Sequence, residues 1–516
     1  MNSTNQSQNN SLTLSWIKLG IVSLGLAGLY SIILVVLRTP QLSRFFPNPH
    51  IFKSALIIHV NLSVLIWLLS ITASVWSLSL QQSSMSFLQP LMSFPRKRES
   101  ILFFLDSSLR WNDILCRLAF LATFLIAISS IAGHNPVMNN YIPMLENIVF
   151  ILGLSIFGVT LLLYAINILY FFDWANLNSL VNFTILSTII MFILSFVCFG
   201  WSYNGLQNII QIIPIEIEFY YELLFWSGGH LLQFIYTQIL IFIWVILFQK
   251  LIDRELKFQK FHLFLLYLNF ISSILVLFGH ISYDIIDGAF KEFYTNHMKY
   301  LGGIAPVLCL VGMGVEFLSF RGLTAESSKK IDPAVKPRDD TVIINNRVIK
   351  TILLCSITLF LLGGLIAMNI TGINVVIPSH YHGSIVGISI ACMGYSYFGI
   401  NVIPNPYVIP AKAGMQTKVF ERMDSCFRGN DIRGYGMTCA IYLLTFGQIL
   451  HILGLALAGG YGVMRKDPNN SVMLMSTKLL MGMMGGGGLI AIVGGLMFVY
   501  ICVRVMFFKS IKLEHE

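Results

Sequence analysis

The stretch SHYHGSIVG, residues 379–387, places two histidines inside a long apolar segment that we delimit at 374–402. On an α-helix, a separation of two residues corresponds to a rotation of about 200°. We therefore expect His380 and His382 to face opposite sides of one helix. In that arrangement they cannot bind one ion together, but each can serve a different metal centre. An ionisable side chain inside an apolar segment is costly and indicates function.

The composition around this segment is that of a membrane protein. The 516 residues are 56% hydrophobic and only 11% charged, and the mean hydropathy is +0.75. A soluble domain carries roughly 25% charged residues. These values exclude an ordinary soluble enzyme, a disordered chain and a disulfide-stapled secreted scaffold. The eight cysteines are scattered and form no CxxC motif.

Twelve segments have the length of a membrane span, which is about 20 apolar residues for a helix. We predict spans at 15–37, 54–80, 115–134, 144–172, 180–203, 221–249, 261–285, 297–320, 348–369, 374–402, 436–461 and 471–503. The expected fold class is an all-α membrane protein. We expect residues 1–516 to form one twelve-helix domain.

The basic residues indicate the orientation of these spans. Of the Lys and Arg residues, 23 lie on the side that holds the N-terminus and 7 on the other side. By the positive-inside rule, the first side and both termini are cytoplasmic. The formal charge of +9 is thereby explained by the loops, and we expect no nucleic-acid partner.

Two of the expected cytoplasmic loops share a repeated motif. LDSSLRWNDI (105–114) and MDSCFRGNDI (423–432) agree at six of ten positions. The segments resemble translated palindromic repeat elements. We therefore predict loop insertions near 92–114 and 403–435 that carry no chemistry.

Three further histidines, His59, His230 and His280, lie within the second, sixth and seventh spans. At a rise of 1.5 Å per residue, these three and the pair in the tenth span lie roughly 7–14 Å below the outer surface. A shared depth favours a layer of metal ligands, although imidazole suits iron and copper equally. His451, in the eleventh span, is expected to lie off this layer and to be structural.

Twelve spans with histidines in spans 2, 6, 7 and 10 resemble subunit I of the haem-copper oxidase superfamily. Four strings fit this resemblance: HVNLSVLIW (59–67), NYIPMLENIVFILGL (140–154), GGHLLQF (228–234) and SHYHGSIVG. They are similar to a divergent bacterial group of cytochrome c and quinol oxidase polypeptides. The resemblance implies a terminal oxidase subunit in the bacterial cytoplasmic membrane that reduces O2 to water. It also implies a separate subunit II or cytochrome c subunit, and cytochrome c or quinol as electron donor.

The resemblance also implies cofactors and ligands. His59 and His382 would ligate a low-spin haem, and His380 would be the proximal ligand of a high-spin haem. His230 and His280 would bind a copper ion that faces the second haem. Electrons would pass from the low-spin haem to this haem and metal centre.

The sequence departs from the family pattern around the copper site. Gly279 stands where the family has the first of two adjacent histidines, and Phe234 stands where it has a tyrosine. We expect Tyr283 to be the candidate catalytic tyrosine in its place. His297 would be a third copper ligand if the eighth span begins near the site.

Three other functions stay open. The first is an altered-metal relative, such as a nitric oxide reductase with non-haem iron. The second is a degenerate haem protein without catalysis. The third is a twelve-span secondary transporter, a class in which broken helices are typical. The run GMMGGGG (482–488) indicates either such a broken helix or a close helix-packing face.

Overall fold

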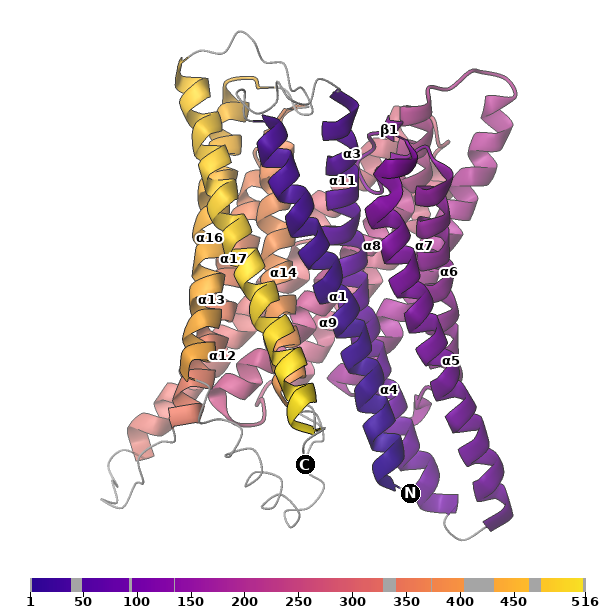
Figure 1. The fold of residues 1–516 in the computed structure, drawn as a ribbon, viewed down its shortest axis with the longest axis vertical. Coiled ribbons are helices and arrows are strands. Elements are labelled where there is room, and N and C mark those ends of the chain that lie inside the picture. Colours follow the sequence, from indigo (N-terminus) through magenta and orange to yellow (C-terminus); the bar gives the residue numbers. More distant parts are fainter. Residues whose placement is uncertain are drawn as a thin grey trace. The chain divides into compact units, whose positions relative to one another are not determined.

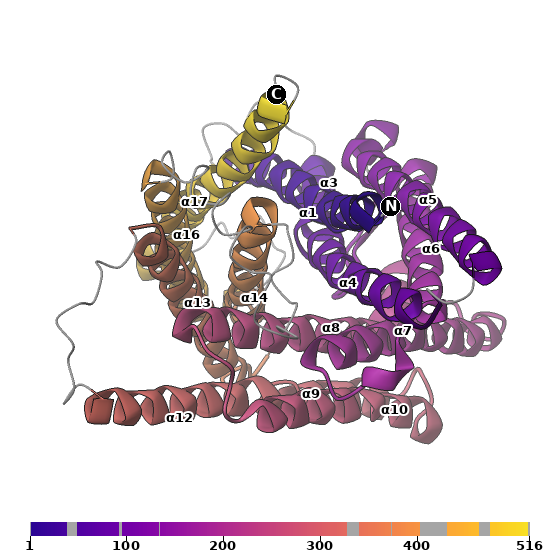
Figure 2. The same ribbon diagram turned by 90° about the horizontal axis from the view of Figure 1, so that it is seen from below.

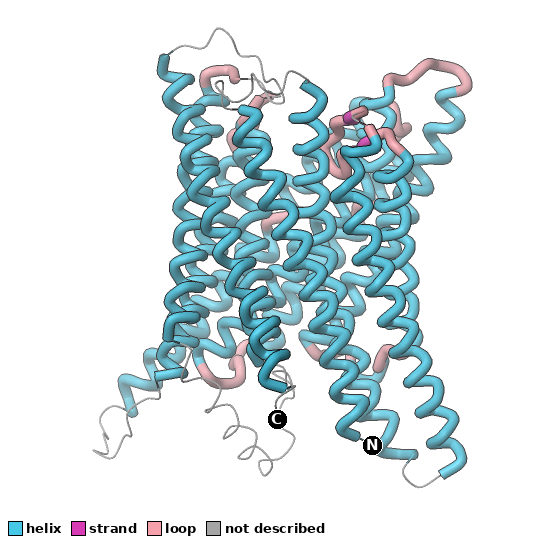
Figure 3. The backbone as a smooth tube through the Cα atoms, viewed as in Figure 1, coloured by secondary structure: helices cyan, strands magenta, loops and turns pink. Residues whose placement is uncertain are grey.

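The computed structural model describes residues 2–38, 49–91, 95–133, 135–327, 340–372, 374–402, 431–463 and 475–513. These residues are predominantly helical (Figures 1 and 3). The chain divides into two compact units. The first unit comprises Met1–Phe242 and Gln259–Cys309, and the second comprises Ile243–Phe258 and Leu310–Glu516.

The first unit contains the candidate residues of spans 2, 6 and 7. Its elements are α1 (Asn2–Arg38), α3 (Pro49–Val60), the π-helical η1 (Asn61–Ile66), α4 (Trp67–Leu91), α5 (Pro95–Ile128), η2 (Ser129–Ala132), β1 (Pro136–Val137), β2 (Met144–Leu145), α6 (Ile148–Tyr170), η3 (Trp174–Asn176), α7 (Leu180–Ile210), most of α8 (Ile217–Ile252), α9 (Gln259–Ile274), α10 (Leu277–Ser282), α11 (Gly288–Leu301) and the start of α12 (Ile304–Ser327). Figure 3 shows the two short strands, which pair antiparallel with Pro136 opposite Leu145.

The second unit contains the paired histidines. It holds the ends of α8 and α12 together with α13 (Asp340–Ala367), α14 (Val376–Val402), α16 (Asp431–Gly460) and α17 (Met475–Leu513). Helices α16 and α17 lie side by side along much of their length (Figure 1). Helix α14 packs against α13 and α16, as the perpendicular view also shows (Figure 2).

The predicted number of spans is confirmed: within the residues described, twelve helical segments are long and apolar enough to cross a membrane. The largest difference in bounds concerns the eighth span, which runs from Gly288 to Ser319 rather than from 297. The charged residues Lys291, Glu292 and Lys299 lower the local hydropathy and hide this start from a sequence reading.

The first predicted loop insertion is not a loop in the structure. From Pro95 onward the segment is part of α5. Proline is well tolerated at the first helical position, and the stretch that follows is rich in helix-forming residues. Of the second predicted insertion, 403–430 lies outside the described residues and Asp431 already begins α16.

Polar side chains inside the first unit join its helices by hydrogen bonds. Trp76 Nε1 on α4 donates to Thr188 Oγ1 on α7 over 2.9 Å. Gln238 Nε2 on α8 donates to Ser187 Oγ on α7 over 2.9 Å, and Asn269 Nδ2 on α9 donates to Gln238 Oε1 over 2.7 Å. Polar groups in a hydrocarbon environment need such partners. The network fixes α7, α8 and α9 around the candidate site.

The seventh span is interrupted between α9 and α10. The N–H of Val276 bonds to the carbonyl of Ser273 at 3.2 Å, and that of Gly279 to the carbonyl of Val276 at 3.2 Å. These are bonds to the third residue back, tighter than the regular α-helical pattern. The main-chain carbonyl of Ser272 is thereby left for a side chain of another helix.

Glycines allow the helices of the second unit to touch. A Cβ at Gly487 on α17 would lie 2.6 Å from the carbonyl oxygen of Gly447 on α16. A Cβ at Gly494 would lie 2.4 Å from the main-chain nitrogen of Leu444. Helix α17 is continuous through the run 482–488. Of the two interpretations of that run, the close helix-packing face is therefore correct.

Candidate functional site

His230 is the centre of the site in the first unit. It lies on α8 and is only 2% exposed. Its Nδ1–H donates to the carbonyl of Trp226 over 2.7 Å, because a carbonyl can only accept. The lone pair of the neutral ring is therefore on Nε2. This nitrogen accepts a hydrogen bond from the Tyr141 hydroxyl over 3.0 Å.

Tyr141 reaches His230 from the turn between β1 and β2. The Oδ1 of Asn139 accepts the main-chain N–H of Tyr141 over 3.1 Å and fixes this turn. The glycines of the GGH motif make room for the neighbours of the histidine. A Cβ at Gly229 would lie 2.4 Å from the Tyr141 ring, and one at Gly228 would lie 2.7 Å from the carbonyl oxygen of Ser195 on α7. Both glycines are thus required by close packing.

His280 lies on α10, just after the break in the seventh span. Its Nε2 is 2.8 Å from the Oγ of Ser227, a buried residue of α8. The imidazole stacks on the indole of Trp201, with ring centroids 5.0 Å apart and an interplanar angle of 12°. Ser227 lies about one turn before His230 on α8, so His280 contacts α8 next to His230.

Tyr294 on α11 lies against both histidines. Its ring centroid is 5.2 Å from that of His230 and 6.3 Å from that of His280. A Cβ at Gly279 would lie 2.6 Å from the hydroxyl oxygen and from Cζ of Tyr294. The Tyr294 ring thus fills the space into which a side chain at position 279 would project. Its hydroxyl donates to the carbonyl of Val276 over 2.9 Å.

His297 lies one helical turn further along α11. It is 7% exposed, and its Nε2–H donates to the carbonyl of Ser272 over 2.8 Å. Its Nδ1 is buried without a hydrogen-bond partner among the described residues. The ring packs on Phe234, with centroids 5.2 Å apart. The eighth span begins before His297, which was the condition for His297 to be a third copper ligand. In the structure, however, its Nε2–H is bonded to a carbonyl at the break in the seventh span.

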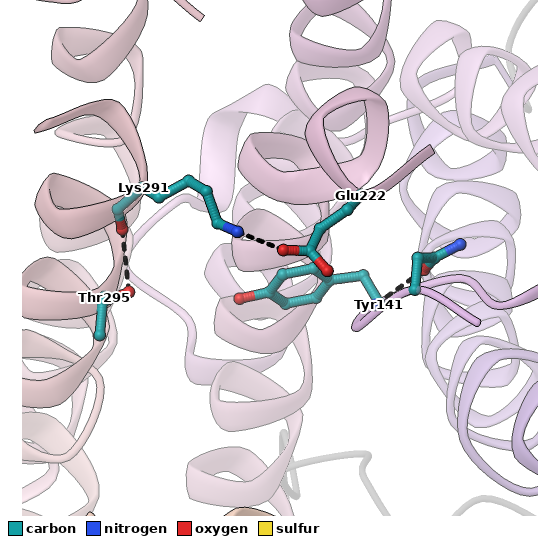
Figure 4. Close-up of polar contacts among 5 residues, drawn as sticks. Tyr141, Glu222, Lys291 and Thr295 are labelled. Carbon is teal, nitrogen blue, oxygen red and sulfur yellow. Dashed lines mark hydrogen bonds and ion pairs between the residues drawn. The ribbon is translucent and has the colours of Figure 1, made fainter. Parts of the chain in front are cut away.

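An ion pair lies next to Tyr141. Lys291 on α11 pairs with Glu222 on α8 (Figure 4). The Lys291 ammonium group lies 4.8 Å from the centre of the Trp226 ring. Tyr141 lies in the same close-up, beside Glu222 (Figure 4). Burial, and to a smaller extent the charge of Glu222, raises the pKa of Tyr141. The phenol therefore stays protonated and remains a hydrogen-bond donor to His230.

The residues present do not fit a copper ion held by three ligands. Within the described ranges, no three His, Cys, Asp or Glu side chains form a group able to hold a metal ion. The structure brings His230 and His280 together around Tyr294, and the described residues add no third ligand. In both rings Nε2 is engaged by a hydroxyl group, from Tyr141 and Ser227 respectively.

Tyr283 does not join this site. It ends α10, is 36% exposed, and its ring packs against Phe293 with centroids 5.8 Å apart. The tyrosines that contact His230 are Tyr141 and Tyr294, which the sequence analysis missed. The spacing of Phe290, Tyr294 and His297 at helical intervals was the available signal for α11, because all three are buried on one face.

His59 lies near the end of α3, also in the first unit. Its Nδ1–H donates to the carbonyl of Ala27 on α1 over 3.0 Å, and the Oγ of Ser31 lies at the same distance. The lone pair is again on Nε2. A π-helical segment begins at Asn61, two residues after this histidine. Such segments are frequent at functional sites.

His380 and His382 in the second unit point in different directions, as the helical geometry predicts. His380 Nδ1–H donates to the carbonyl of Gly363 on α13 over 2.8 Å. The ring of His382 instead contacts that of His451 on α16, with centroids 4.8 Å apart. This contact contradicts the expectation that His451 lies off the layer of the other histidines, whereas its structural role stays a prediction. The sequence places His451 within the eleventh span, but it does not show which neighbouring helix the side chain faces.

The architecture defines the class: an all-helical, multi-pass membrane protein with the fold of haem-copper oxidase subunit I. A heme-copper terminal oxidase dimer solved by cryo-EM matches with a TM-score of 0.65 at 12% identity, over 96% of this chain and 84% of that one. No protein-family model matches the sequence.

Two relatives are found by sequence. Uncharacterized protein RP382 of Rickettsia prowazekii (strain Madrid E) is 66% identical over 527 aligned positions, covering 100% of both chains. An uncharacterized protein of Aquifex aeolicus (strain VF5) is 25% identical over 389 positions, covering 74% of this chain and 83% of that one. The chain belongs to the family of Rickettsia prowazekii RP382.

Proposed function

We propose that this chain is a haem-binding subunit of a membrane oxidoreductase of the terminal oxidase type. One observation carries the proposal. His59 and His380 both donate Nδ1–H to a main-chain carbonyl, over 3.0 and 2.8 Å. Metal-ligating histidines are held in this way, because the bond fixes the ring and presents Nε2 to the metal.

The histidine chemistry fits haem. Neutral imidazole with its lone pair on Nε2 is an axial ligand for haem iron. The assignments implied by the resemblance are kept: His59 and His382 for a low-spin haem, and His380 for a high-spin haem. The low-spin haem would supply one-electron transfer, and the high-spin haem an open coordination position. The chain itself orients the rings through the carbonyls of Ala27 and Gly363.

The residues packed around His230 distinguish two versions of this function. Reduction of O2 to water next to a copper ion is the version that the resemblance implies. The position of Tyr294 against Gly279 favours a second version, an altered-metal or non-catalytic haem protein. In either version Tyr141 holds a proton at His230 Nε2, and Ser227 orients His280.

Electron entry would require a partner of this chain. The chain has no copper-binding cysteine pair and no CxxCH motif. We therefore assign electron entry to a separate subunit, which receives electrons from cytochrome c or quinol. The membrane would be the bacterial cytoplasmic membrane.

The test is a carbon monoxide difference spectrum of the reduced, purified protein. A bis-histidine haem has no open position, whereas a five-coordinate haem binds CO. We expect a CO-binding haem that is lost in His380→Ala and retained in His50→Ala, because His50 is exposed at the start of α3. Haem without CO binding would support the non-catalytic version. A folded, haem-supplied preparation without haem would refute the proposal.

A further inference from the structure

The second unit contains a contact between two histidines, of which the oxidase resemblance includes only His382. The rings of His382 on α14 and His451 on α16 are 4.8 Å apart between centroids, with an interplanar angle of 66°. This is an edge-to-face contact, so each ring restricts the rotation of the other. Two imidazoles in direct contact inside an apolar span are costly unless they serve a purpose.

His451 is itself fixed by α17. Its Nδ1–H donates to the carbonyl of Met484 over 2.9 Å. A main-chain carbonyl has two lone pairs, so it can accept this bond without leaving its own helix. The bond sets the tautomer of His451 and prevents the ring from turning. His451 therefore offers His382 a rigid surface rather than a mobile one.

The glycine run of α17 makes this anchor possible. A Cβ at Gly487 would lie 2.6 Å from the main-chain nitrogen of His451, so the two backbones touch at this level. A Cβ at Gly488 would lie 3.2 Å from His451 Nδ1. By contrast, Gly485 and Gly486 have nothing within 4 Å of such an atom. Within 485–488, close packing thus requires glycine only at Gly487 and Gly488, which face His451.

We propose that His451 is a positioning residue that holds the His382 imidazole in the orientation it needs as a haem ligand. This inference rests on the proposed haem at His382. The chain of contacts runs from the Met484 carbonyl through His451 to His382. Partners that orient a metal-ligating histidine typically change metal affinity by about 10–100-fold when removed.

The experiment uses purified full-length protein and a graded set of variants. His451→Leu removes the ring and the donor, whereas His451→Asn keeps a donor for the Met484 carbonyl. Gly488→Ala displaces the His451 ring by a few tenths of an ångström, because the added Cβ meets Nδ1 at 3.2 Å. Gly485→Ala is the matched control, with nothing in reach of its Cβ. His382→Ala reports whether the haem assignment holds.

The first readout is the low-spin haem, followed by its EPR signal, its midpoint potential and its retention. We expect His382→Ala to abolish the signal. His451→Leu should weaken retention by about 10–100-fold and shift the potential. Gly488→Ala and His451→Asn should give smaller shifts, and Gly485→Ala none. A second readout needs no haem: the ring-nitrogen NMR signals of His382 should move in His451→Leu and Gly488→Ala.

Three results overturn the inference or its basis separately. If His382→Ala loses the haem while His451→Leu and Gly488→Ala match Gly485→Ala, His451 does not position His382 and the proposed function stands. If His451→Leu loses the haem while His382→Ala keeps it, His451 is the ligand itself. If the parent protein holds no low-spin haem, the proposed function fails, and unmoved NMR signals in His451→Leu then refute the inference as well.

Discussion

Two sets of histidines in this chain differ in what occupies Nε2. His59 and His380 donate Nδ1–H to main-chain carbonyls, which puts the lone pair on Nε2. His230 and His280 have hydroxyl groups at Nε2, from Tyr141 and Ser227. The first set has the chemistry of metal ligands. The second set forms a hydrogen-bonded polar cluster with its own internal partners.

The difference shows that histidines of one chain can be held in two chemically distinct ways. A metal-ligating histidine requires a carbonyl that accepts its Nδ1–H and space for the metal at Nε2. A copper site requires several side chains that converge on one point. At Gly279, which has no side chain, the Tyr294 ring fills the adjoining space. Substitutions at both sets of histidines and their neighbours test whether this contrast is real.

The largest effect is expected from His59→Ala. Removal of an axial ligand should abolish the low-spin haem signal in the reduced-minus-oxidised spectrum. Ser31→Ala is the matched control, because it removes a neighbour of the ring and leaves the bond to the Ala27 carbonyl. An unchanged low-spin signal in His59→Ala would remove His59 from the first set.

The next effect concerns the space at position 279. In Gly279→Ala the new methyl group meets the Tyr294 ring at 2.6 Å, and overpacking of this kind costs about 1–3 kcal/mol. Thermal unfolding of the purified protein in detergent measures the loss. Gly288→Ala, with nothing within 4 Å, is the control. Equal stability of the two variants would show that Tyr294 does not occupy that space.

A smaller effect is expected when Tyr141 loses its hydroxyl. Tyr141→Phe removes the hydrogen bond to His230 Nε2, which contributes about 1 kcal/mol. The same change frees Nε2, so the affinity for added Cu2+ should rise by about fivefold. Calorimetric titration measures it, and Tyr300→Phe at an exposed position is the control. A lower copper affinity in Tyr141→Phe would mean that the phenol supports metal binding.

The smallest effect is expected at the ion pair. Lys291→Met should lower stability by roughly 0.2–1 kcal/mol, since partly exposed pairs contribute little. The loss should shrink at high salt, where charges are screened. Lys299→Met on the same helix serves as control. A larger, salt-independent loss would indicate that the ion pair is needed to seat Tyr141.

The spans and the directions of the paired histidines were predictable because both follow from simple periodicities. Apolar length reveals a span, and a rotation of about 100° per residue separates His380 from His382. Neither argument reveals which helices are neighbours. The contact between His382 and His451 depends on α14 packing on α16, and no local pattern encodes that.

The polar partners of His230 could not be predicted for two different reasons. Tyr141 comes from a turn far away in the chain, and only the folded structure brings it to α8. Tyr294 lies on a helix whose charged residues, Lys291 and Glu292, made it look like a loop outside the membrane. The sequence shows a glycine at position 279, but it does not show that the Tyr294 ring fills the space beside it.

The interruption of the seventh span has a consequence for how the protein enters the membrane. The Ser272 carbonyl at this break is bonded by the His297 side chain of α11. A main-chain group without a partner in lipid costs several kcal/mol. The seventh span on its own is therefore less stable in the bilayer than an uninterrupted helix. We therefore expect the seventh span to insert together with the eighth, which supplies His297.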